Sequence, residues 1–82
     1  MYMKIRGVNG VEVEPRIVTT LRVSIPRSAL PNPPPYVLRL KCGDAAVELK
    51  LSSISTNTAI YTVPKNAQEA VLSNDTVCTV IQ

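Results

Sequence analysis

The feature that most constrains this chain is an alternation of apolar and polar side chains with a period of two, which continues through most of its 82 residues. Successive side chains of a β-strand point to opposite faces, so this period predicts strands with one face in a core and the other in solvent. The sequence therefore predicts about six to eight short strands, separated by turns every 8–12 residues or so. We expect an all-β fold, either a small antiparallel β-sandwich or a barrel-like domain with a proline-rich connector.

The clearest predicted element is a hairpin over residues 36–51. The alternation in its first strand assigns Tyr36 to the core, and its turn contains Gly43, which can adopt a positive φ. The remaining alternating segments are interpreted as strands over residues 2–6, 11–14, 16–25 (as one strand), 59–63 and 76–81, with turns at 7–10 and 73–75. Residues 64–72 fit a strand and a single helical turn equally well, because Pro64 is tolerated in a first helical turn.

The apolar residues are numerous but small. The chain is 45% hydrophobic, yet it has no Phe, no Trp and three Tyr. Aromatic side chains normally supply large buried areas, so a core without them is thin, and a domain of this size is marginally stable. We therefore expect a single domain over residues 1–82, with part of its apolar surface buried in a homo-oligomer or against other proteins.

The titratable residues do not predict an active site. The absence of histidine removes the commonest general base and most catalytic zinc sites. Among the carboxylates, Glu12 and Glu14 share one strand face, where solvent is their expected surrounding. No phosphate-binding glycine loop or nucleophile elbow is present. We expect neither an enzyme nor a cofactor, metal or small-molecule substrate.

Two cysteines, Cys42 and Cys78, each lie in a predicted strand. They are too few and too far apart for a zinc site by themselves, and we interpret them as small buried side chains. A disulfide between them would require an oxidising compartment that nothing in the sequence indicates. No segment approaches the ~20 apolar residues of a membrane helix, and the N-terminus lacks the apolar core of a signal peptide. We expect no contact with a membrane.

Two groups of residues are candidates for binding a partner. Within a proline-rich loop or arm at residues 26–35, the segment 31–35 is either a stiff connector between sheets or an extended arm on a neighbouring subunit. Alternating positions place two pairs of basic residues on common strand faces. Nucleic acid is not an expected partner, because stacking needs exposed aromatics and Tyr36 is assigned to the core. The candidate residues are Pro31, Asn32, Pro33, Pro34, Pro35, Arg16, Arg22, Arg39 and Lys41.

Residues 58–64, with the sequence TAIYTVP, and the later Val77-Cys78 resemble a strand pair of tailed-phage virion proteins with a β-sandwich fold. The resemblance covers about a third of the chain. It implies a structural protein of a virus particle, most plainly a capsid cement or decoration protein, or else a neck or tail component. Its partners would be copies of itself, a major capsid protein or other virion proteins. Its location would be the virion, assembled in the host cytoplasm.

A second resemblance ranks below the first. Residues 22–27 (RVSIPR) and 40–44 (LKCGD) are similar to two motifs of the swapped-hairpin, AbrB-like regulators. That resemblance implies a small dimeric β-rich DNA-binding transcriptional regulator. In that family a helix of about two turns joins the motifs, whereas this chain has PNPPP between them, and no helix tolerates that run of prolines.

Overall fold

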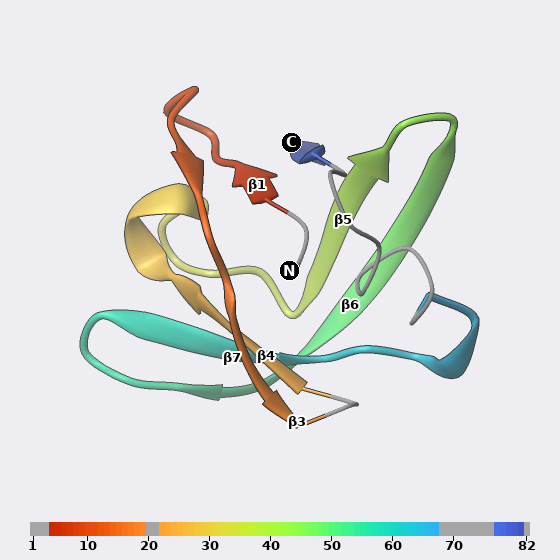
Figure 1. The fold of residues 1–82 in the computed structure, drawn as a ribbon. Helices are drawn as coiled ribbons and strands as arrows, with labels where there is room; N and C mark the ends of the chain where they lie inside the picture. Colours follow the sequence, from red (N-terminus) through yellow and green to blue (C-terminus); the bar gives the residue numbers. More distant parts are fainter. Residues whose placement is uncertain (1–3, 20–21, 68–76, 82) are drawn as a thin grey trace.

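The computed structural model describes residues 4–19, 22–67 and 77–81, which form a single curled β-sheet (Figure 1). In chain order the strands are β1 (Lys4–Arg6), β2 (Glu12–Val13), β3 (Arg16–Thr19), β4 (Arg22–Pro26), β5 (Val37–Cys42), β6 (Ala45–Ile54), β7 (Thr58–Thr62) and β8 (Val77–Ile81). The helical segments within the described residues are two short 3₁₀ turns, η1 (Arg27–Ala29) and η2 (Lys65–Ala67). The predicted all-β class is confirmed.

The strand order is β2-β1-β8-β5-β6-β7-β4-β3. Its two end strands follow one another in the chain and are separated only by Glu14 and Pro15, so the sheet must curl back on itself. The result is a half-barrel, the barrel-like member of the two predicted architectures. One pair departs from the predicted antiparallel arrangement, because β1 and β8 run parallel and bring together strands from the two ends of the chain.

The long strand β6 is where the sheet bends. Its first part, from Ala45 to Lys50, pairs with β5, whereas its second part, from Lys50 to Ile54, pairs with β7. The register with β7 shifts between Leu51 and Ser53. A bulge of this kind increases local twist, which lets one strand belong to both halves of the sheet. In Figure 1 the β5–β6 hairpin rises from the level of β7 and β4.

The core lies inside the curl and is apolar throughout. Its largest member is Tyr61, which is fully buried and donates a hydrogen bond from its hydroxyl to the carbonyl of Pro35 at 2.6 Å. Burial also raises the pKa of this hydroxyl. The other members of this core are Ile5, Val23, Ile25, Ala29, Leu30, Leu38, Leu40, Cys42, Leu49, Ala59, Val63, Cys78 and Val80. Tyr61 faces inward together with Ala59 and Val63, as alternation over residues 59–63 predicts.

Several predicted elements appear with small changes of bounds. The opening hairpin is present as β1 and β2, and the hairpin of residues 36–51 as β5 and β6, with Gly43 at a φ of 61° in its turn. The segment predicted as strand or helical turn begins with η2, and its residues 68–72, like the predicted turn at 73–75, lie outside the described residues. The predicted last strand is β8.

Residues 16–25 were predicted as one strand, which is wrong. They form the antiparallel hairpin of β3 and β4, in which Thr19 pairs with Arg22 and Ile17 with Val23. Alternation alone cannot reveal this reversal. The register shifts between Ile17 and Thr19, so Ile17 and Val23 share a face, and Arg16 and Ser24 share the other, as they would in one continuous strand.

The assignment of Tyr36 to the core is also wrong, since its side chain is 66% exposed. Strand β5 begins only at Val37, directly after the proline-rich segment. Tyr36 therefore lies outside the strand whose alternation predicted its direction.

The predicted burial of the two cysteines is confirmed, but their interpretation as separate side chains is wrong. Cys42 of β5 and Cys78 of β8 are direct cross-strand partners, with their Cα atoms 4.2 Å apart, and they form a disulfide. The bond joins residues separated by 36 positions in the sequence. Separation along the chain concealed a pairing that only the strand order creates.

Candidate interaction surfaces

The proline-rich segment lies against its own domain. Pro34 is buried, and Pro31 and Pro35 are half-buried. The carbonyl of Pro35 accepts the hydroxyl of Tyr61, which attaches the segment to the core. In the structure it is a connector from η1 to β5, and only Asn32 and Pro33 present exposed side chains. The motifs at residues 22–27 and 40–44 are thus joined by η1 and this connector, without a helix of two turns.

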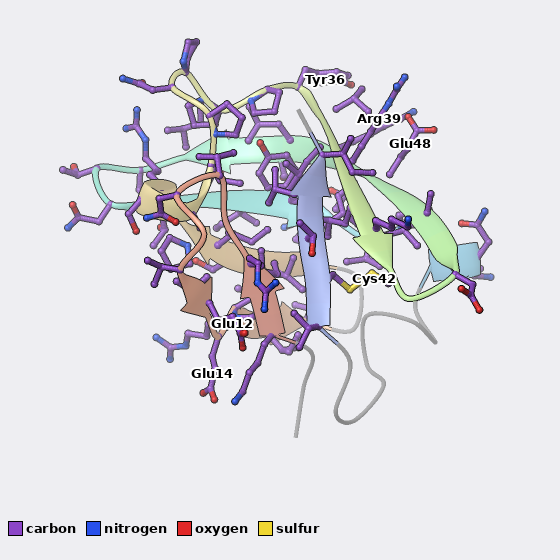
Figure 2. The ribbon with its side chains drawn as sticks, turned by 90° about the horizontal axis from the view of Figure 1, so that it is seen from above. Glu12, Glu14, Tyr36, Arg39, Cys42 and Glu48 are labelled. Carbon is purple, nitrogen blue, oxygen red and sulfur yellow. A yellow bond between two sulfur atoms is a disulfide. The ribbon has the colours of Figure 1, made fainter. Side chains whose placement is uncertain are left out.

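The predicted pair Arg39 and Lys41 lies on the outer face of β5, with both side chains exposed. Arg39 faces Glu48 of β6, and its Nε lies 3.6 Å from the Glu48 Oε2 (Figure 2). Both side chains are more than 60% exposed, so this ion pair contributes little to stability. Lys41 pairs across the sheet with Thr79 on one side and Ala46 on the other.

The second predicted pair, Arg16 and Arg22, lies on the outer face of the β3–β4 hairpin. The register places Arg22 beside Thr62 of β7, and Thr62 in turn beside Lys50 of β6. Lys50 was missed from the sequence as a candidate. Its position between the core-facing Leu49 and Leu51 could have shown that it points outward, but not that it lies near Arg22.

An outer apolar cluster forms where β5 begins and β8 ends. It consists of Tyr36, Val37 and Ile81, which are 66%, 37% and 43% exposed. Ile81 is the cross-strand partner of Arg39, so it lies diagonally across from Val37. Side chains of this size and exposure, gathered on one face, are typical of a surface that another protein covers.

A shallow hollow of about 340 Å³ adjoins this cluster at Val37. Its other lining residues are Ala46, Val47, Glu48, Lys50, Pro64 and Asn66. Val37, Ala46, Val47 and Pro64 are its apolar lining residues, and Glu48 and Lys50 supply its charged groups. Within the described residues, no group of three or more histidine, cysteine or acidic side chains is arranged to hold a metal ion.

The remaining pair of interest, Glu12 and Glu14, lies on the opposite side of the molecule from Tyr36, Arg39 and Glu48 (Figure 2). Both carboxylates are exposed, and Glu12 forms an ion pair with Arg6 at 3.0 Å. Strand β2 ends before Glu14, so the two do not share a strand face as predicted. They stand in solvent.

No helix within the described residues is long and apolar enough to cross a membrane. Comparison with protein-family models, curated proteins and solved structures finds no match to this chain. The surfaces of the protein are therefore the features that bear on its function.

Proposed function

We propose that this protein is a structural component of a virus particle, acting as a capsid cement or decoration protein, or as a neck or tail component. It acts by binding copies of itself or other virion proteins rather than by catalysis. The observation that carries the proposal is the outer apolar cluster of Tyr36, Val37 and Ile81, which stays exposed although the domain has a complete core of its own.

The composition of this surface supports a protein partner. Tyr and Arg are over-represented among the side chains that contribute most to protein–protein affinity, and here exposed Tyr36 and Arg39 flank exposed Val37. The adjoining hollow at Val37 offers a recess into which a partner's side chain fits. An apolar centre with Glu48 and Lys50 at its border matches the arrangement of a protein interface, with its polar rim.

The resemblance of residues 58–64 to phage virion strands supports the virion as the setting. In the structure this segment is β7 with the two residues after it, and Tyr61 is its inward-facing member. A particle offers many equivalent sites at once. Repeated weak contacts then add up to strong attachment, so one small interface per copy is enough.

The test is co-sedimentation with the virus particles made by the genome that encodes this protein. Val37→Glu combined with Ile81→Glu places two charges in the apolar cluster. We expect this double variant to reduce the particle-bound fraction at least about tenfold, because desolvating even one unpaired carboxylate costs more than about 1.4 kcal/mol. A matched control is Ile54→Glu, which alters an apolar side chain of similar exposure at the far end of β6. Equal binding by the double variant and the unaltered protein would refute the proposal.

A further inference from the structure

Three cations lie in line on the outer face of the sheet where β6, β7, β4 and β3 run side by side. They are Lys50, Arg22 and Arg16, here called the basic stripe, and all three side chains are exposed. Lys50 and Arg22 stand on either side of Thr62, as its two cross-strand partners. Arg16 pairs with Ser24, two residues along β4 from Arg22, so Arg16 and Arg22 are diagonal neighbours.

The spacing within the stripe follows from the geometry of a sheet. Neighbouring strands are about 4.8 Å apart, so the backbones at Lys50 and Arg22 are separated by roughly 10 Å. Diagonal neighbours such as Arg22 and Arg16 are about 7–8 Å apart. The side chains are long enough to adjust over several ångströms, so the stripe presents a short, evenly charged line rather than a pocket.

None of the three cations of the stripe has an ion-pair partner among the described residues. Two described carboxylates lie two residues from a cation of the stripe in the sequence. Glu48, before Lys50, is held by Arg39, and Glu14, before Arg16, is exposed and lies outside β3. Thr62 and Ser24, which stand between the cations, carry hydroxyls that can donate to phosphate oxygens.

A second cross-strand row on the same sheet also contains two cations, but one of them is ion-paired. Arg6 of β1 and Lys41 of β5 also stand on either side of a threonine, Thr79 of β8. In that row, however, Arg6 is ion-paired with Glu12 at 3.0 Å. Both rows place two cations on either side of a threonine, but the second row contains the parallel pair of β1 and β8, and one of its two cations is ion-paired.

We propose that the basic stripe binds the phosphate backbone of nucleic acid without reading its sequence. A line of unpaired cations with hydroxyls between them suits a regularly spaced polyanion. The exposed ring of Tyr36 lies near the Lys50 end, because the Tyr36 carbonyl accepts the amide of the adjacent Leu51 at 2.7 Å. An unpaired base can stack on such a ring. This proposal does not depend on the proposed function. The two surfaces share Tyr36 and Lys50, but Arg22 and Arg16 of the stripe lie outside the apolar cluster.

The test is fluorescence anisotropy of the full chain with a single-stranded DNA oligonucleotide and with the matching duplex, at increasing salt. We expect binding at low salt whose logarithm falls linearly with the logarithm of salt concentration, with a slope of about −2 for three contacts on a single strand. The triple variant Arg16→Gln, Arg22→Gln, Lys50→Gln should bind at least about tenfold more weakly and lose most of that slope.

The matched control neutralises the same number of charges at the other row, by Arg6→Gln and Lys41→Gln within it and Lys4→Gln two residues before Arg6 on β1. We expect it to retain most of the affinity. Equal losses in the two triple variants would show a response to net charge alone and overturn the proposal, as would an unaltered protein that binds neither DNA at low salt. Tyr36→Ala distinguishes single-stranded from duplex nucleic acid as the ligand. A loss of affinity for the single strand alone would show that an unpaired base stacks on Tyr36. Unchanged affinity for both would show that the protein contacts only the phosphate backbone. Near-ultraviolet circular dichroism confirms that each variant is folded.

Discussion

The two halves of the curled sheet hold together in different ways. The half made of β1, β8 and β5 buries aliphatic side chains and is cross-linked by the Cys42–Cys78 disulfide. The half made of β7, β4 and β3 also buries aliphatic side chains, such as Val23 and Ile25, but has no cross-link among its described residues. Its largest buried side chain, Tyr61, donates a hydrogen bond to the carbonyl of Pro35.

Both halves contain strands that are distant in the chain, and the greatest separation is that of β1 from β8. Strands β3 and β4 form a tight hairpin, whereas β1 and β8 come from opposite ends of the sequence. Pairing distant segments costs more chain entropy than closing a hairpin. A covalent link from β8 to β5 reduces that cost, because it restricts the unfolded chain. In the other half β4 pairs with β7, which is also a distant segment of the chain, and no covalent link reduces that cost, so packing around Tyr61 has to offset it.

The largest expected effect is that of removing the aromatic anchor. Tyr61→Ala empties the centre of the uncross-linked half and should lower the free energy of unfolding by about 3–5 kcal/mol. Urea denaturation measures the change, and Tyr36→Ala is the control because that side chain is exposed. We expect less than about 0.5 kcal/mol for the control. A similar cost for both variants would contradict the inward role of Tyr61.

The next effect is that of removing the cross-link. Cys42→Ala with Cys78→Ala should lower the free energy of unfolding by about 2–4 kcal/mol, as the loss of a bond that closes a loop of this length predicts. Hydrogen exchange adds a test of location. We expect protection to fall most in β8 and β1, and less in β7 and β4. A uniform loss across the sheet would show that the halves do not differ in this respect.

A smaller effect tests the hydrogen bond of Tyr61 alone. Tyr61→Phe keeps the ring but leaves the carbonyl of Pro35 without its donor. We expect a loss of about 1 kcal/mol by urea denaturation at neutral pH. A loss as large as that of Tyr61→Ala would mean that the hydroxyl, and not the packing of the ring, stabilises this half.

The same substitution has a predicted pH dependence. Burial raises the pKa of Tyr61 above its ordinary value of 10.0, so the folded protein keeps this proton at a pH where the unfolded chain releases it. The stability that this pKa difference contributes is complete below pH 10 and is lost as the pH rises through the pKa of the folded state. Above pH 10, the midpoint temperature of thermal unfolding should therefore fall less steeply with pH for Tyr61→Phe than for the unaltered protein. Parallel curves for the two proteins would contradict the pKa shift.

The smallest effect is expected on the outer surface. Glu48→Gln breaks the ion pair between Glu48 and Arg39, which are both largely exposed. The change in unfolding free energy should stay within about 0.5 kcal/mol. A larger loss would show that the ion pair stabilises the β5–β6 hairpin, and that the outer face of the sheet also contributes to stability.

The sequence by itself determined the local features of this protein. Alternation predicted most strands, the inward side of Leu38 and Tyr61, and the outward side of Arg39 and Lys41. It could do so because the direction of a side chain in a strand depends only on its parity. The turn at Gly43 was predicted for a similar reason, since a positive φ is a property of one residue and its neighbours.

Tertiary structure alone decided which strands are neighbours. The parallel pairing of β1 with β8, the disulfide and the line of Lys50, Arg22 and Arg16 all depend on the strand order. The direction of Tyr36 also depended on where β5 begins after the proline-rich connector. Strand order is chosen by the burial of the whole chain and by closure of the curled sheet. The alternation of side chains within a single strand does not reveal which other strands are its neighbours.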